Sequence, residues 1–208
     1  MICTVCQGET RAIRRDNYSH YSVVVFTRIE IEKCQRCGTE SLSPALEERV
    51  NPLVARSLIR KQGRLKAAEI WFLRRHILRK KPAELAKYLG ATPVTVTRWE
   101  AGPVGGGLGP QALKGAKPSK GQDIGEASDR LLRLFVSSTI DASSAEVASL
   151  WQFFSENADA LSRKSPALVL RVYWDGRRLQ DEEWDGVGME ESAKRRRSSA
   201  KSHRGIGP

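Results

Sequence analysis

The chain has 208 residues, which is enough for one moderate hydrophobic core or for two or three small folded units. Its 35 lysines and arginines against 24 aspartates and glutamates give a net charge of +11 and a pI near 9.8, so we expect a polyanionic partner, nucleic acid first and an anionic membrane surface second. The longest apolar run, residues 23–26, is far shorter than the roughly 20 residues of a membrane-spanning helix, which argues against an integral membrane protein.

The N-terminus carries no sign of a secretory signal, because Met1-Ile2-Cys3 leads directly into polar and charged residues. We therefore expect a cytoplasmic protein in a reducing environment. In such an environment, cysteines in paired spacing are more often metal ligands than disulfides.

The cysteines predict a metal site. They form two C-x-x-C pairs: Cys3, Cys6, Cys34 and Cys37. A C-x-x-C turn points two thiolates the same way, and two such turns complete a tetrahedron around Zn²⁺. Gly8 and Gly38 follow the pairs, where a tight turn can require a positive φ. Two disulfides, or a redox C-x-x-C, are the alternatives, but the redox motif needs a βαβ context that is absent. We expect one structural zinc ion.

The segment between the two pairs predicts short strands, so residues 1–42 should form a small β-rich, zinc-ribbon-like domain. Alternate residues that are mostly apolar should share one face: Val23, Val25, Thr27, Ile29 and Ile31. His20 also lies between the pairs. Four cysteines already close the metal shell, so we expect His20 to be a surface or packing residue.

Residues 43–64 predict a helical connector. Ser43 is a suitable N-cap, and Pro44 suits the first helical position. Asn51-Pro52 should kink or break this helix before Leu53, because proline removes a helical hydrogen bond and clashes with the preceding turn.

Residues 65–137 predict a compact helical domain, within which Glu69 to Gly102 have the pattern of a helix-turn-helix. The expected helices are Ala67–Leu78, Pro82–Leu89 and a third that begins at Pro93, capped by Thr92. Gly90 provides the turn between the second and third helices. A short helix, a glycine-containing turn and a second short helix form the helix-turn-helix layout.

The third helix should insert its outer face into the major groove of DNA. Val96 and Trp99 are expected to face inward together with Thr92 and Thr95, and Arg98 could contact guanine or a phosphate. From residue 60 to residue 81 nine basic side chains oppose only Glu69, although they could also form a solvated basic face on a helical bundle. The predicted DNA-binding residues are Lys80, Lys81, Thr92, Pro93, Val94, Thr97 and Arg98.

The remainder of the chain alternates between glycine-rich and structured segments. The Gly-rich insertion at 103–125 predicts a linker or long loop. Residues 138–185 predict a C-terminal extension with a helix and strands, in which residues 168–174 and 177–179 flank a hairpin turn at Asp175-Gly176. Residues 186–208 predict a basic disordered tail that could add non-specific DNA affinity or keep the chain soluble.

Two further expectations concern assembly and catalysis. Leu150, Trp151 and Phe154 are apolar residues that could mediate a homodimer or pack within the chain. No nucleophile–base pair, carboxylate pair or phosphate loop is recognisable, and the histidines lie in unrelated contexts, with His76 expected at the surface. We therefore expect a protein that is not an enzyme.

The expected fold class is mainly α, with a small β-rich N-terminal domain, a helix-turn-helix bundle and a C-terminal β-hairpin.

The helical domain resembles the Cro/repressor-like (XRE) helix-turn-helix. Three motifs carry the resemblance: Ile70-x-x-Leu73-Arg74, Leu85-Ala86-x-x-Leu89-Gly90 and Thr95-Val96-Thr97-Arg98-Trp99-Glu100-x-Gly102. Together with the paired cysteines, this layout resembles the YgiT-type zinc-finger regulators of the MqsA antitoxin family over residues 1–102.

The resemblance implies a dimeric bacterial DNA-binding protein that represses its own promoter. It implies zinc ligation by the four cysteines and DNA contact by Arg98. The alternative that it implies is an antitoxin whose residues 1–42 neutralise a small ribonuclease toxin. Val94 stands where members of the family carry a base-reading asparagine, and Pro82 stands where a DNA-contacting glutamine is common, so the resemblance implies no operator sequence.

Overall fold

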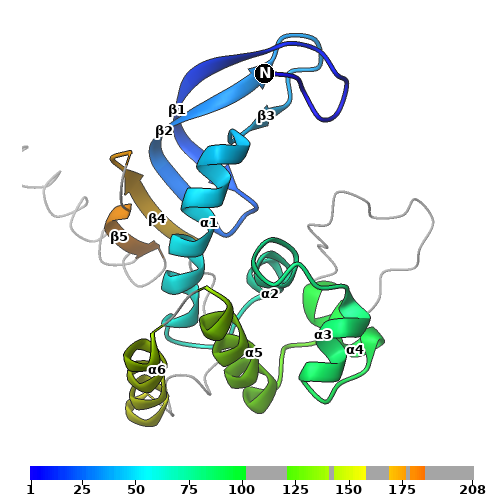
Figure 1. The fold of residues 1–208 in the computed structure, drawn as a ribbon, viewed down its shortest axis with the longest axis vertical. Coiled ribbons are helices and arrows are strands. Elements are labelled where there is room, and N and C mark those ends of the chain that lie inside the picture. The colour runs from blue at the N-terminus through cyan, green and yellow to red at the C-terminus, as the bar shows by residue number, and fades with distance from the viewer. Residues whose placement is uncertain (102–120, 141–142, 158–168, 177–178, 186–208) are drawn as a thin grey trace, which may run out of the picture.

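A mixed β-sheet occupies one part of the molecule and a group of helices the other, with a long helix running between them (Figure 1). The computed structural model describes residues 1–101, 121–140, 143–157, 169–176 and 179–185. The architecture of these residues is mixed α/β. The predicted tail at 186–208 and most of the predicted Gly-rich linker lie outside the described residues.

The sheet combines strands from both ends of the chain. β1 (Thr10–His20) and β2 (Val24–Cys34) form a long antiparallel hairpin, and the short β3 (Glu40–Ser41) pairs with the end of β2. β4 (Val169–Trp174) pairs with the start of β2 in parallel, and β5 (Leu179–Asp185) pairs with β4 in antiparallel orientation. The predicted C-terminal hairpin is thus confirmed, but it extends the N-terminal sheet. Its return strand begins at Leu179, where the predicted strand 177–179 was expected to end, and it is longer than expected.

The prediction that one face of β2 is continuously apolar is wrong. Val24 and Phe26 are buried in the first half of the strand, whereas Ile29 and Ile31 are buried in the second half, so the buried face changes between the halves. The β1–β2 pairing is irregular at this point, where Asn17 has a φ of +56°. A left-handed residue changes the local direction of the strand, and this changes which side chains face the core.

The long helix α1 (Pro44–Ile59) begins as the sequence predicts, with the Ser43 hydroxyl accepting a hydrogen bond from the Leu46 N–H at 3.3 Å. The helix continues through Pro52, so of the two expected effects of Asn51-Pro52, a kink or a break, the break is wrong. Its buried face, made by Val50, Val54, Ala55 and Leu58, lies on both sides of the proline. Packing of this face offsets the roughly 3 kcal/mol that an interior proline costs.

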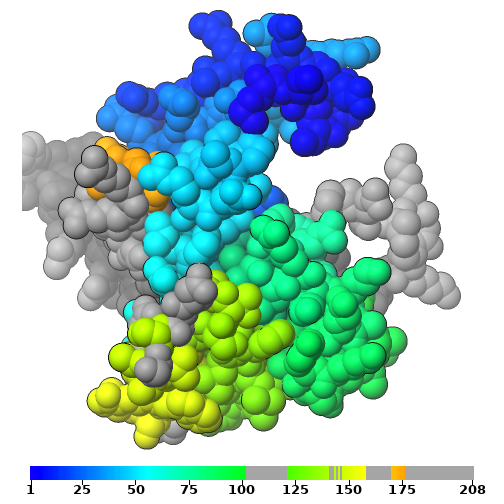
Figure 2. Space-filling view, in the orientation of Figure 1, coloured from blue at the N-terminus to red at the C-terminus, as the bar shows by residue number. Residues whose placement is uncertain are grey.

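Five helical segments follow α1 in the helical part of the molecule: α2 (Ala67–Phe72), η1 (Leu73–Ile77), α3 (Pro82–Tyr88), α4 (Pro93–Ala101) and α5 (Glu126–Thr139). α6 (Ser144–Glu156) packs against α5, and Figure 2 shows the two helices side by side at the end of the molecule away from the N-terminus. The predicted helix 67–78 is confirmed, but its second half, η1, is π-helical, with the Leu78 N–H donating to the Leu73 carbonyl at 2.9 Å. None of the described helices is long and apolar enough to cross a membrane.

α5 is fixed to the rest of the helical part by a buried arginine, which hydrophobic periodicity does not predict. Arg133 is fully buried, pairs with Asp129 at 2.8 Å, and donates to the carbonyl oxygens of Ile59, Lys61 and Gly63 at 3.1, 2.7 and 2.6 Å. The buried apolar residues of α5 are Leu132 and Val136, while Leu131 is exposed. Arg133 therefore fixes the end of α1 and the following loop against α5.

Candidate functional site

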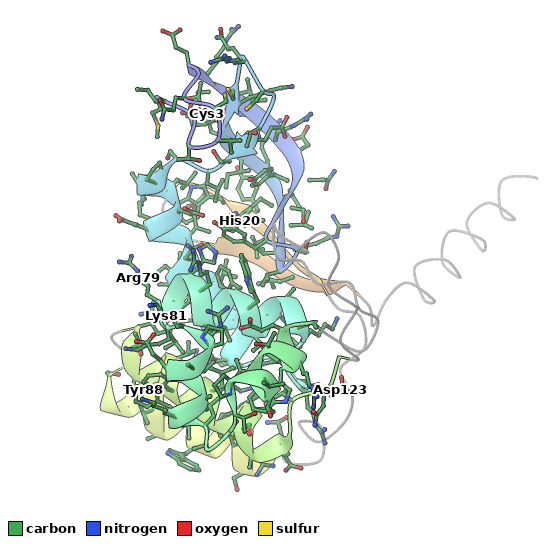
Figure 3. All side chains as sticks on the ribbon, turned by 90° about the vertical axis from the view of Figure 1, so that its right-hand side faces the viewer. Cys3, His20, Arg79, Lys81, Tyr88 and Asp123 are labelled. Carbon is green, nitrogen blue, oxygen red and sulfur yellow. The ribbon has the colours of Figure 1, made fainter. Side chains whose placement is uncertain are left out.

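The four cysteines come together in one group, and Cys3 lies at the end of the sheet that is away from α2 to α6 (Figure 3). Cys3 and Cys6 lie in the segment before β1, Cys34 is the last residue of β2, and Cys37 lies in the turn after it. The β1–β2 pairing, in which Thr10 lies opposite Cys34, brings the two turns side by side. The structure therefore confirms that the two pairs form one cluster.

The geometry of the cluster suits a tetrahedral metal ion. The Cys3–Cys37 and Cys6–Cys34 sulfur atoms are 3.7 and 3.4 Å apart, and all four sulfurs lie within 4.8 Å of one another. Four sulfurs at about 2.3 Å from a central zinc ion would be separated by about 3.8 Å. Cys3 and Cys34 are buried, so the cluster can hold a metal ion while it supports the end of the sheet.

Hydrogen bonds favour thiolate on the second cysteine pair. The Thr39 hydroxyl lies 3.1 Å from the Cys37 sulfur and lowers the pKa of Cys37 to about 6. The Cys37 backbone N–H donates to the Cys34 sulfur at 3.5 Å and lowers the pKa of Cys34. A hydrogen bond from the Gly8 backbone also lowers the pKa of Cys6. Hydrogen bonds with Cys37 and Cys34, together with burial, outweigh this effect and raise the pKa of Cys6 to about 12. Thiolates are the form that binds metal.

The two glycines beside the pairs have different roles. Gly38 has a φ of +73°, as a tight turn requires, and a Cβ there would meet no other atom within 4 Å. Gly8 has no positive φ; instead, a Cβ on it would lie 2.8 Å from the Arg36 Cβ and 3.3 Å from the sulfurs of Cys34 and Cys6. The positive φ in this turn belongs to Gln7, at +58°.

Gly8→Ala is expected to weaken metal binding more than Gly38→Ala. The methyl group added at position 8 would push against the sulfurs and the opposite turn. Gly38→Ala should cost only about 1–2 kcal/mol of backbone strain. Competition with a chromophoric chelator would measure the affinity of each variant. Equal affinities for the two variants would contradict the close approach at Gly8.

A second candidate surface is formed by α3, the turn after it and α4. Gly90 in this turn has a φ of +61°, and the Thr92 hydroxyl accepts a hydrogen bond from the Thr95 N–H at 3.2 Å, which confirms the predicted cap. Val96 and Trp99 are buried as predicted. Thr92 is exposed, contrary to the prediction that it faces inward, because its side chain caps the start of the helix.

The outer side of α4 is solvent-exposed. Val94 is 59% exposed, and Pro93, Thr97 and Arg98 are exposed with it. The Thr97 hydroxyl donates to the Pro93 carbonyl at 3.0 Å, which leaves its oxygen available as an acceptor. We call Pro93, Val94, Thr97 and Arg98 the α4 surface. Whether it contacts DNA stays a prediction.

Of the two lysines expected beside this surface, Lys81 is exposed at the start of α3 and Lys80 is half-buried (Figure 3). The Lys80 ammonium lies 5.9 Å from the centroid of the Tyr88 ring. Two other members of the predicted basic group are internal. Lys61 is buried in an ion pair with Glu69 at 2.7 Å, and Arg74 is buried and paired with Glu100. These two stabilise the helices, and their charges are not presented to a partner.

Two histidines, His20 and His76, lie at the junction between the sheet and the helices. His20 is buried and lies 3.1 Å from the Asn51 side-chain oxygen, so its predicted packing role is confirmed. His76 was expected at the surface, but its ring packs against Tyr21, with the ring centroids 4.0 Å apart, and against Phe72. Burial lowers the pKa of His20 and lowers that of His76 to about 4. Both rings are therefore neutral near pH 7.

The chain matches no protein-family model, no curated protein and no solved structure. The functional assignment therefore rests on the residues and their geometry.

Proposed function

We propose that the protein is a sequence-specific DNA-binding transcriptional regulator, a repressor, in which α3 and α4 form a helix-turn-helix and the cysteine cluster holds one structural Zn²⁺. The observation that carries the proposal is the exposure of Val94 beside Thr97 and Arg98 on a helix whose opposite side is buried through Val96 and Trp99. An apolar residue beside an arginine and a threonine suits contact with thymine methyl groups, phosphates and base edges.

Charge supports the same partner. The whole chain carries a net charge of +11, and Lys81, Lys87 and Arg98 are exposed on α3 and α4. Such side chains attract phosphates at long range and lose affinity as salt increases. The ion pair between Arg74 and Glu100 joins the start of η1 to α4, which would hold α4 in a fixed orientation for docking.

Zinc is the metal that best suits the cluster. Four thiolates in tetrahedral arrangement select a soft or borderline ion, and a closed shell of four cysteines is typical of structural zinc. Among the four ligands no position is left for water, so the proposed role of the ion is to fix the end of the sheet and not to catalyse a reaction.

The proposal includes a homodimer. Of the three residues on which the sequence prediction depends, Leu150 and Phe154 are buried within the chain and Trp151 is 58% exposed. A second apolar area lies between α3 and α5, where Tyr88 and Leu131 are exposed at 57% and 47% beside a cleft of about 290 Å³. A second copy of the chain could cover this area beside the α4 surface.

Arg98→Ala is expected to weaken binding to the DNA upstream of the protein's own gene by roughly 1–3 kcal/mol, because a charge-assisted contact to a base or phosphate is lost. Fluorescence anisotropy at about 0.15 M salt, with random duplex as competitor, would measure it. Arg14→Ala on β1 is the matched control, since Arg14 is equally exposed and belongs to the sheet. Equal binding of upstream and random duplex by the unmodified protein would overturn the proposal.

A further inference from the structure

A cleft of about 610 Å³ lies between α1 and the segment from η1 to the start of α3, away from the metal cluster and the α4 surface. Glu47 and Glu48 line it from α1, and Arg75 and His76 line it from η1. Arg79, after η1, and Thr139 and Ile140, at the end of α5, also line it. The volume lies within the roughly 300–1,000 Å³ that is common for small-molecule sites.

The cleft carries both signs of charge on separate elements. The carboxylate of Glu47 accepts a hydrogen bond from the Tyr21 hydroxyl and lies 3.8 Å from the His20 ring, and Glu48 is exposed next to it. Arg75 and Arg79 are also exposed, and within the described part of the chain neither forms an ion pair. The two guanidinium groups are therefore available to an anionic group, while the two carboxylates favour a cationic one.

The wall that carries the arginines has an unusual backbone. η1 is π-helical, and Arg79, directly after it, has a φ of +53°. Single π-helical turns occur frequently at functional sites, and a non-glycine residue with positive φ costs about 1–3 kcal/mol and is retained when the surrounding structure requires it. Together these two features place Arg75, His76 and Arg79 along one wall of the cleft.

Between the charged groups the cleft is uncharged. The His76 ring is held by Tyr21 and Phe72, and its pKa of about 4 keeps it neutral. Its Nε2 atom is buried and finds no hydrogen-bond partner among the described residues. Ile77 and Ile140 add apolar surface. A bound molecule with charged ends and a short apolar body would match this set of groups.

We propose that this cleft binds a small zwitterion of amino-acid or dipeptide size, with its ammonium group toward Glu47 and Glu48 and its carboxylate toward Arg75 and Arg79. A polyanion such as a nucleotide is disfavoured, because the two glutamates would repel its phosphates. The proposal goes beyond DNA binding and does not depend on it. The cleft wall leads directly into α3, since Arg79 is followed by Lys80, Lys81 and the first residue of α3.

Isothermal titration calorimetry of the full chain with alanyl-leucine, which has free termini, tests the proposal without DNA. Saturable binding of one dipeptide per chain is expected, and L-leucine should bind to the same site. Acetylating the amino group or amidating the carboxyl group should each weaken binding about tenfold or more, because each removes a charge-assisted hydrogen bond. DNA-binding failure would leave this result unchanged, so the two proposals fail separately.

Glu48→Gln and Arg75→Gln, both at exposed positions, should each weaken dipeptide binding by about tenfold, whereas the control Lys87→Gln, on exposed α3 surface, should leave it unchanged. The proposal is overturned if neither alanyl-leucine nor L-leucine binds saturably. The proposal is also overturned if alanyl-leucine with both termini blocked binds as tightly as the free dipeptide, or if Glu48→Gln and Arg75→Gln both bind the free dipeptide as tightly as the unmodified protein does.

Discussion

Replacing Cys34 with serine is expected to reduce metal affinity by more than about 100-fold and to unfold the metal-bearing end of the sheet. Changing an outer-shell partner of a metal ligand already costs about 10–100-fold, and loss of a ligand should cost more. Structural zinc contributes on the order of 10 kcal/mol of apparent free energy to the folding of small domains. Cys34 is buried and belongs to both the cluster and β2, so metal loss should propagate into the β1–β2 hairpin.

Elemental analysis of the purified protein would measure the metal content, with about one zinc per chain expected before the substitution and little after it. Amide hydrogen exchange would locate the unfolded region, which should include β1 and the start of the chain. Gln35→Ala is the matched control, because Gln35 is exposed in the same turn and supplies no ligand. Full metal content in Cys34→Ser would contradict a four-cysteine site.

Arg133→Met is expected to lower the free energy of unfolding by about 3–5 kcal/mol, a large fraction of the total stability of a typical domain. The change leaves the Asp129 carboxylate buried without its partner and removes the donors to the Ile59, Lys61 and Gly63 carbonyls. Burial already raises the pKa of Asp129, and the loss of the guanidinium should raise it further. Urea denaturation followed by circular dichroism would measure the stability.

Arg130→Met provides the control for that substitution. Arg130 lies on the same helix and pairs with Glu126 at 2.5 Å, but both side chains are partly exposed, at 32% and 41%. An exposed pair of this spacing contributes about 0.3–0.5 kcal/mol, so the control should be close to the unmodified protein. A similar loss of unfolding free energy in Arg133→Met and Arg130→Met would show that the burial of Arg133 does not contribute to stability.

The sequence by itself determined the features that depend on neighbouring residues. The paired spacing of the cysteines predicts two pairs of ligands, because each C-x-x-C turn brings its own two sulfurs together, and the strands between the pairs then join them into one cluster. The caps at Ser43 and Thr92 and the turn at Gly90 were predictable for the same reason, since side-chain size and hydrogen-bonding groups act within a few residues. The exposure of Val94, Thr97 and Arg98 followed from helical periodicity once the helix was placed.

The tertiary structure decided the features that depend on packing between distant segments. β4 joins β2 across more than a hundred residues, and no local pattern specifies that pairing. The burial of Lys61, Arg74 and Arg133 depends on acidic partners and carbonyl groups in other helices or loops, so charge alone made these residues resemble surface residues. The helix through Pro52 and the packing of His76 also depend on distant contacts. Packing of α1 offsets the cost of a proline inside a helix, and the contact with the Tyr21 ring offsets the cost of burying a polar imidazole.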